Sequence, residues 1–272
     1  MSRGSDASGN GGGEDMSVSI SRIHSLLACM ALAAAGITGS ASAQAADIYD
    51  SAVHHPGRSA ADLKRDALDH PADVLRLSNI GPGMRVADVL AGDGYYSELL
   101  SYIVGPRGHV LLLNNSAYDH WSDNGWQKRL AKLPNVEHRT MDLEHLELPD
   151  ASLDAALLVK VYHDLYWTDS AGTWPKMDPS KVLDEVARVL KPGAILLVVD
   201  HSAKPGTGKS DAGSLHRIDE AYARADFAAH GFQLVGQSDA LRRPEDAREQ
   251  ISYKPPMLGK TDRFVFVFRK RA

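Results

Sequence analysis

Apolar residues occur in short continuous runs along most of the chain, and longer mixed stretches separate these runs. The runs that are typical of buried strands lie at 85–90, 109–113, 136–139, 155–159 and 195–199. Between the last two runs, residues 182–190 place valine and leucine at helical spacing, which predicts an amphipathic helix. Buried strands that alternate with amphipathic helices indicate a parallel sheet covered by helices on both faces.

Two helices are predicted ahead of the first strand. Ser59 is a helix-capping residue in front of residues 60–69, and Pro71 opens a second helix that extends to about Asn79. The sequence Gly-Pro-Gly at 81–83 then interrupts the chain before the first strand.

The C-terminal part follows a different pattern. Leu215, Ile218, Tyr222 and Ala225 line a predicted helix that stops at Gly231, and two strands follow at 232–236 and 263–269. Phenylalanine and valine alternate in the second of these strands, and the polar, proline-rich stretch 242–260 shows no helical period. We therefore expect the last two strands to pair antiparallel through a long loop.

The N-terminal segment has the features of an export signal. Residues 1–15 are rich in Gly, Ser and Asp, and an apolar run at 26–37 precedes Ala-Ser-Ala at 41–43. A small-x-small sequence after a short apolar run is typical of a secretory signal peptide, and the run is shorter than the roughly 20 residues of a membrane-spanning helix. We expect a periplasmic or secreted protein with no membrane span after cleavage, and an uncleaved anchor helix is the alternative.

Composition narrows the class of protein. Of the 272 residues, 43% are hydrophobic and 24% are charged, an ordinary globular mix. The net charge of -5 argues against a nucleic-acid-binding protein. Cys29 is the single cysteine, which excludes an internal disulfide and a zinc site of several thiolates. We divide the chain into residues 1–43 (start and signal peptide), an irregular lead-in at 44–58 and one domain at 59–272.

A glycine loop follows the first predicted strand. Asp88 ends this strand, Gly92 and Gly94 come next, and Tyr95 opens a helix. Glycines let a backbone pass close to a ligand, and a helix start offers free N–H groups to an anion. The same arrangement serves dinucleotide phosphates and the carboxylate of S-adenosylmethionine, and tight strand–helix turns need glycine as well.

From Ala60 to its C-terminus the chain resembles the class I S-adenosylmethionine-dependent methyltransferases, and among them a bacterial branch that often carries signal peptides. The motifs that carry the resemblance are the glycine motif at 86–96, Thr140-Met141-Asp142 before Leu148-Pro149, residues 153–164, residues 188–193 ahead of the strand at 195–200, residues 215–219 and residues 259–265. The resemblance implies a Rossmann-like α/β fold with a seven-stranded, mostly parallel sheet, an antiparallel last strand and helices on both faces.

The resemblance also implies a set of S-adenosylmethionine contacts. Its members follow the first, second, third and fourth strands and are Asp88, Ala91, Gly92, Gly94, Tyr95, Asn114, Asp142 and Lys160. Asp142 would approach the adenine amino group, and Lys160 would border the transfer site. Two positions depart from the family pattern. Leu90 replaces the first glycine of the motif, and Asn114 or Asn115 replaces the acidic residue that binds the ribose hydroxyls, so charge-assisted strength is lost there.

Histidines follow the fourth and fifth strands, where open α/β sheets place their sites. His163 is a candidate general base for methyl transfer, with Asp164 orienting it or binding substrate, and His201 is a second candidate. The structural alternative for His163 and Asp164 is a helix-start turn with Asp164 as its cap.

Further along the chain, His216 and Arg217 are substrate candidates, because an arginine can hold an anionic acceptor. A solvated helix face is the competing interpretation of Arg217. His163, Asp164, His201 and His216 would suffice for a metal site if they converged, but sequence spacing does not establish convergence, and no metal ligand is assigned.

The first functional hypothesis is therefore an S-adenosylmethionine-dependent methyltransferase that acts on a small-molecule acceptor, with no nucleic-acid substrate. The alternative is an exported, non-catalytic binding or sensor module that retains the fold. It rests on Leu90, on the missing acidic ribose ligand and on export away from the cytoplasm, where S-adenosylmethionine is made. A nicotinamide-dependent oxidoreductase is the third hypothesis. The lack of a G-x-G-x-x-G pattern argues against it.

Overall fold

The structure is a computed structural model that describes residues 47–169 and 171–272. The predicted signal peptide lies outside the described residues. These described residues form one compact unit.

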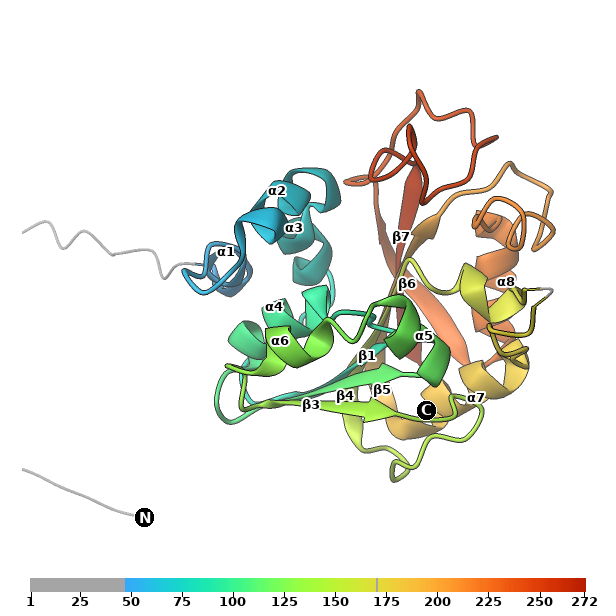
Figure 1. Ribbon diagram of the computed structural model, residues 1–272. Helices are drawn as coiled ribbons and strands as arrows, with labels where there is room; N and C mark the ends of the chain where they lie inside the picture. The colour runs from blue at the N-terminus through green and yellow to red at the C-terminus, as the bar shows by residue number, and fades with distance from the viewer. Residues whose placement is uncertain (1–46, 170) are drawn as a thin grey trace, which may run out of the picture. The chain divides into compact units, whose positions relative to one another are not determined.

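A seven-stranded sheet runs through the unit (Figure 1). Its strands are β1 (Arg85–Val89), β2 (His109–Asn114), β3 (Val136–Thr140), β4 (Leu153–Val159), β5 (Leu190–His201), β6 (Phe232–Ser238) and β7 (Arg263–Lys270). Their order is β3-β2-β1-β4-β5-β7-β6, and β7 alone runs antiparallel to its two neighbours. The predicted class of sheet is confirmed, including the antiparallel pairing of the last two strands.

Helices cover both faces of the sheet. They are α1 (Ile48–Val53), α2 (Ala60–Asp69), α3 (Pro71–Arg76), α4 (Tyr95–Val104), α5 (Ser116–Trp121), α6 (Trp126–Leu130), the 3-10 helix η1 (His163–Tyr166), α7 (Pro179–Val189) and α8 (Glu220–Ala229). One apolar core lies under α1, α3 and α4, and the other lies under α5, α7 and α8. In Figure 1, α1, α3 and α4 lie on one side of the strands, and α7 and α8 lie on the other. Among the described residues, no helix combines the length and the apolar character needed to cross a bilayer.

Side chains along β7 point alternately to the two faces of the sheet. The three phenylalanines at 264, 266 and 268 enter the core under α7 and α8, and Val265 and Val267 enter the core under α4. Because side chains alternate along a strand, Arg263 lies on the same face as the valines. It therefore faces α2 rather than α8, which brings it to the candidate site described below.

Two expectations from the sequence are wrong in detail. The stretch 44–58 contains α1, because the Asp47 carboxylate caps the helix by accepting from the Tyr49 N–H at 2.8 Å and Val53 is buried in the core. The helix expected from about 215 begins at Glu220, because Asp219 is its capping residue and accepts from the Ala221 N–H at 2.8 Å. The long loop between β6 and β7 contains turns and no helix, as expected.

Candidate active site at the carboxyl edge of the sheet

The glycine loop joins β1 to α4 and bends through three left-handed residues. Leu90, Gly92 and Gly94 have φ values of 54°, 60° and 85°. A Cβ atom on Gly94 would lie 2.7 Å from Cδ1 of Leu112, so this position needs glycine for its space as well as for its φ. Leu90, which replaces the first glycine of the family motif, is buried and packs into the core beneath the loop. The loop thus keeps its path without that glycine.

Asn114 ends β2, and its side-chain amide hydrogen-bonds only to other groups of the protein. Its Oδ1 accepts from the Gly92 N–H at 3.0 Å, and its Nδ2 donates to the Gly92 carbonyl at 3.0 Å and to Oδ1 of Asp119 at 2.7 Å. The residue is 0% exposed. As placed, Asn114 has no amide proton left for a ribose hydroxyl. Its role in the structure is to hold the glycine loop, a role that the sequence did not suggest.

Helix α5 lies over the same loop. Atoms of Trp121 and Tyr118 come within 3.7 and 4.0 Å of the position that a Cβ of Gly92 would occupy. Asn115 caps this helix by accepting from the Tyr118 N–H at 2.9 Å, so its side-chain oxygen also serves the protein. The surface of the loop at Gly92 is therefore covered by aromatic side chains.

Asp88 lies at the end of β1, buried beneath the start of α4. Its Oδ2 accepts a hydrogen bond from the Ser97 hydroxyl at 2.7 Å. In the described part of the chain, no Lys or Arg lies within 4 Å of its carboxylate. Burial therefore raises the pKa of Asp88 to about 7. A buried carboxyl group without a cation is a suitable partner for a ligand ammonium.

Tyr95, expected to contact the cofactor, instead faces α2. Its hydroxyl donates to the carboxylate of Asp66, and the guanidinium of Arg65 lies 3.7 Å from the ring centroid. The ring is 2% exposed. The structure thus uses Tyr95 to attach α2 to α4.

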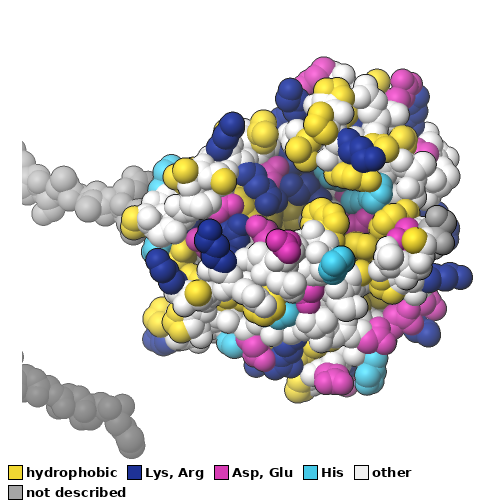
Figure 2. Space-filling view, in the orientation of Figure 1, with side chains coloured by type: hydrophobic (Ala, Val, Ile, Leu, Met, Phe, Trp, Pro, Cys, Tyr) yellow, Lys and Arg dark blue, Asp and Glu magenta, His cyan; other side chains and the backbone are white. Residues whose placement is uncertain are grey.

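Lys160 follows β4 and belongs to a cluster of three cations around one carboxylate. The Asp69 carboxylate accepts from Lys160 Nζ at 2.9 Å, from Arg65 Nε at 2.7 Å and from an Arg263 guanidinium nitrogen at 2.5 Å. Burial and the charge of Arg65 outweigh Asp69 and lower the pKa of Lys160 to about 8. Figure 2 shows Lys and Arg side chains inside the hollow between the part that carries α2 and α3 and the loop before β7. Three cations around one carboxylate leave an excess of positive charge, which favours the binding of an anion.

His163 begins η1, directly after β4. It lies on the face of the sheet that α5, α7 and α8 cover, opposite to the cluster around Asp69. Its Nδ1 lies 2.7 Å from Oδ1 of Asp200, and its Nε2 lies 3.1 Å from Oδ1 of Asp164. Burial alone would lower its pKa, but these two carboxylates outweigh it and raise the pKa of His163 to about 10. Both ring nitrogens therefore have protein partners, so His163 is not placed as a free general base. Asp164 also accepts from the Tyr118 hydroxyl at 2.7 Å.

His201 ends β5 between these two clusters. Its ring centroid lies 5.8 Å from that of His163, and its Nδ1 lies 2.7 Å from the Thr261 hydroxyl oxygen. Burial, together with the positive charge of His163 and Lys160, lowers its pKa well below the usual value. The His201 imidazole is therefore held in its neutral form.

The two substrate candidates ahead of α8 separate. His216 belongs to the cluster of His163 and Asp164. Its Nδ1 lies 3.2 Å from Oδ1 of Asp164 and 3.3 Å from Nε2 of His163. Arg217 is 0% exposed, pairs with Asp246 at 2.8 Å and donates to the Ser202 carbonyl. Arg217 is therefore not placed to bind substrate, and it is not on a solvated helix face either, because its guanidinium ties the loop before β7 to β5.

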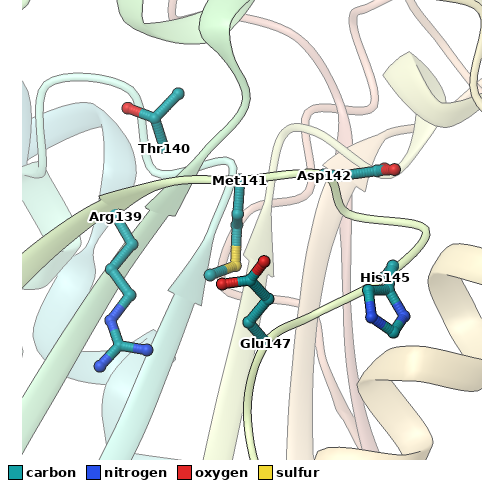
Figure 3. A pocket seen from close by; sticks show the side chains of 6 residues that line it. All are labelled: Arg139, Thr140, Met141, Asp142, His145 and Glu147. Atoms are coloured by element: carbon teal, nitrogen blue, oxygen red, sulfur yellow. The ribbon is translucent and has the colours of Figure 1, made fainter.

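Asp142 lies in the loop after β3, away from the clusters described so far. It lines a hollow of about 490 Å³ together with Arg139, Thr140, Met141, His145 and Glu147. Figure 3 shows the Met141 and Glu147 side chains close together below the loop, whereas the Asp142 carboxylate points away from Arg139. Asp142 is exposed and accepts from the Glu144 N–H at 2.9 Å.

Several residues of these clusters were not expected from the sequence. Asp69 and Arg65 belong to a helix ahead of the sheet, and Arg263 belongs to the last strand. The spacing of four residues between Arg65 and Asp69 on one helix could be seen in the sequence. No local pattern, however, connects either residue to Lys160. Asp200 was visible as a carboxylate at a strand end, and its contact with His163 depends on the pairing of β4 with β5.

Known proteins match the central part of the chain. Residues 87–198 match the sequence model of a family described as "Methyltransferase domain". The ubiquinone/menaquinone biosynthesis C-methyltransferase UbiE of Ectopseudomonas mendocina is 33% identical over 171 residues, which are 62% of this chain and 59% of that protein. The enzyme of the same name from Haemophilus ducreyi is 31% identical over 131 residues, 47% of this chain and 46% of its own length. The chain thus spans about half to three fifths of these curated relatives.

Solved structures share the fold. A SAM-dependent methyltransferase from Aquifex aeolicus superposes with a TM-score of 0.53 at 21% identity, over 77% of this chain and 98% of that chain. The [4+2]-cyclase SpnF superposes with a TM-score of 0.52 at 18% identity, over 80% and 85% of the two chains. At these identities the likeness shows the fold alone, and this fold carries more than one chemistry. Residues 87–198 thus match a methyltransferase-domain family in sequence, and the chain shares its fold with a solved SAM-dependent methyltransferase.

Proposed function

We propose that this chain is an S-adenosylmethionine-dependent methyltransferase that acts on a small-molecule acceptor. The observation that carries the proposal is the meeting of the glycine loop and the polar clusters at one edge of the sheet. Val89 of β1 pairs with Leu158 of β4, and Leu158 pairs with Val198 of β5, all in parallel register. The residues that follow these strands therefore meet at the same edge, where open α/β sheets bind their ligands.

The chain's own residues fit the two ends of the cofactor. Asp88 offers a buried carboxylate without a cation to the methionine ammonium, and the start of α4 offers backbone N–H groups to the carboxylate. The hollow beside Asp142 has room for the adenine end. S-adenosylmethionine supplies a methyl group on a sulfonium, which the acceptor attacks in line.

The cation cluster points to an acceptor with an anionic group. Lys160, Arg65 and Arg263 surround the single carboxylate of Asp69, so the cluster keeps an excess positive charge. Carboxylates and phosphates form strong charge-assisted hydrogen bonds with such groups. The curated relatives are named as C-methyltransferases of ubiquinone/menaquinone biosynthesis, so aromatic acceptors that carry a carboxylate belong in the first acceptor panel.

A non-catalytic binding module is the second candidate. The observation that favours it is the commitment of Asn114 to Gly92 and Asp119, combined with the aromatic cover of Tyr118 and Trp121 over the glycine loop. Both features reduce the surface open to a ribose.

Calorimetric titration with S-adenosylmethionine and S-adenosylhomocysteine separates the two candidates. Asp88→Asn removes the charge that the methionine ammonium needs, and Asp123→Asn is the matched control on an exposed turn. A methyltransferase binds both compounds in the micromolar range, loses roughly tenfold or more in affinity with Asp88→Asn and keeps its affinity with Asp123→Asn. It also transfers a labelled methyl group to a member of the acceptor panel. An absence of binding by the folded protein contradicts the methyltransferase proposal and leaves the binding module.

The sequence at 16–43 leads us to propose export as well. Fusing residues 1–60 to a reporter that is active only outside the cytoplasm tests this. Active reporter is expected, and replacing Ala41 and Ala43 with bulky residues should block processing. A fusion protein that is produced in full but stays inactive and unprocessed would contradict export.

A further inference from the structure

His163, Asp164 and His216 bring three metal-ligating atoms together at the carboxyl edge. The pairs of atoms are His163 Nε2 to Asp164 Oδ1 at 3.1 Å, His216 Nδ1 to Asp164 Oδ1 at 3.2 Å, and His163 Nε2 to His216 Nδ1 at 3.3 Å. Ligands about 2.1 Å from one ion lie roughly 3.0 Å apart in octahedral geometry and roughly 3.4 Å apart in tetrahedral geometry. The nearly equilateral triangle falls between these values.

The groups behind the triangle fit a metal site. The Nδ1 of His163 lies 2.7 Å from Oδ1 of Asp200, and the His163 backbone N–H donates to Oδ2 of the same carboxylate at 2.8 Å. A carboxylate at Nδ1 keeps the proton there and directs the Nε2 lone pair to a metal. The Tyr118 hydroxyl holds Oδ2 of Asp164 at 2.7 Å, which turns Oδ1 toward the triangle.

The charges of the cluster favour a divalent cation. The carboxylates of Asp164 and Asp200 are both buried, and the Tyr118 hydroxyl beside them is neutral. Two neutral imidazoles and two carboxylates would balance a dication.

The site is open on one side. The side chain of His216 is 13% exposed, against 4% for His163. The rings of Trp167 and Tyr253 lie 5.0 and 4.7 Å from the His216 ring and border this side. His216 adopts a left-handed backbone with φ of 50°, a conformation that histidine adopts more readily than most residues.

We propose that His163, Asp164 and His216 bind one divalent first-row transition metal ion, with Asp200 and Tyr118 as positioning residues. Two histidines and a carboxylate on one face of an ion leave positions free for other ligands. The further step, that an acceptor oxygen takes a free position and is polarised there, rests on the proposed methyltransferase function. Metal binding itself does not depend on it.

Cobalt(II) is the probe, because its visible absorption changes when nitrogen and oxygen ligands replace water. The chelator-treated protein is titrated with Co²⁺, and bound Co²⁺ is then displaced with Zn²⁺. One Co²⁺ per chain is expected. His216→Asn and Asp164→Asn should weaken binding by at least roughly 100-fold, and Asp200→Asn by roughly 10- to 100-fold. Asparagine tolerates the left-handed backbone of His216.

His230→Asn is the matched control, because His230 also lies 2.7 Å from an aspartate, Asp184, but the side chain of this aspartate is largely exposed. It should leave Co²⁺ binding unchanged. Zinc should raise the melting temperature of the wild-type protein and not that of folded His216→Asn. A folded wild-type protein that takes up no Co²⁺, or equal Co²⁺ affinity in wild type and His216→Asn, would overturn the metal site. Failure to bind S-adenosylmethionine would contradict the proposed function and leave the metal result standing.

Discussion

The side-chain amide of Asn114 holds both backbone polar groups of Gly92, its N–H through Oδ1 and its carbonyl through Nδ2. This pair joins the end of β2 to the middle of the glycine loop. The second Nδ2 proton goes to Asp119, which also accepts from the Thr140 hydroxyl and lies 2.8 Å from Nε2 of His138. An amide is needed here because it is donor and acceptor at once, whereas the carboxylate that the family pattern favours would only accept.

Asn114→Asp should therefore lower stability and not improve cofactor binding. A carboxylate at 114 would face the Gly92 carbonyl and the Asp119 carboxylate, so three acceptors would compete without a proton. We expect a loss of about 2 to 4 kcal/mol in the free energy of unfolding, measured by urea denaturation. Adding Asp119→Asn restores a donor and should recover part of the loss. Unchanged stability with tighter S-adenosylmethionine binding would contradict the assigned role of Asn114.

Gly94→Ala and Gly83→Ala form a matched pair of substitutions. Their φ values are 85° and 84°, but a Cβ at 94 would lie 2.7 Å from Leu112 Cδ1, and a Cβ at 83 would meet nothing within 4 Å. Both changes add backbone strain of about 1 kcal/mol, and overpacking adds roughly 1 to 3 kcal/mol at position 94 alone. Urea unfolding of the two variants should show this difference, and equal losses would show that the loop at 94 relaxes.

The buried carboxyl of Asp88 predicts a pH dependence of stability. Burial raises the pKa of Asp88 from the ordinary 3.8 to about 7 in the folded protein. Between these values the folded state holds a proton that the unfolded state releases, so the free energy of unfolding falls as pH rises from about 4 to about 7. The change contributed by Asp88 is at most roughly 4 kcal/mol. In Asp88→Asn this contribution should vanish, which urea unfolding at several pH values checks against Asp123→Asn. A parallel pH profile in wild type and Asp88→Asn would count against the raised pKa.

Asp69 holds three cations at the edge of the sheet, so its removal should be costly. Burial alone would raise its pKa, but Lys160, Arg65 and Arg263 hold the pKa of Asp69 well below its ordinary value. Asp69→Asn leaves buried charge uncompensated, and we expect a loss of about 3 to 5 kcal/mol in the free energy of unfolding. Asp73→Asn, which removes an exposed pair with Arg76, should cost less than about 1 kcal/mol. Thermal unfolding of both variants compares the two losses directly, and a small loss for Asp69→Asn would contradict the cluster.

Most of the sheet and its helices could be predicted because their signals are local. Apolar runs and helical periods fixed the strands and α7, and the long loop without a helical pattern indicated the antiparallel β7. The start of α8 was misplaced because Leu215 and Ile218 continue an apolar period that the capping residue Asp219 interrupts. The positions of the predicted strand ends also placed Lys160, His163 and His201 at the carboxyl edge of the sheet.

The partners of these residues could not be predicted. Asp69 and Arg263 are separated by 194 residues, and His163 and His216 by 53, so their contacts depend on strand order, register and helix packing rather than on any local pattern. By itself, the sequence determined which side chains stand at the ends of strands, because periodicity and turn chemistry act over a few residues. Only the tertiary structure decided which of them meet, because the sheet face on which a side chain lies and the helix that covers it are set by long-range packing.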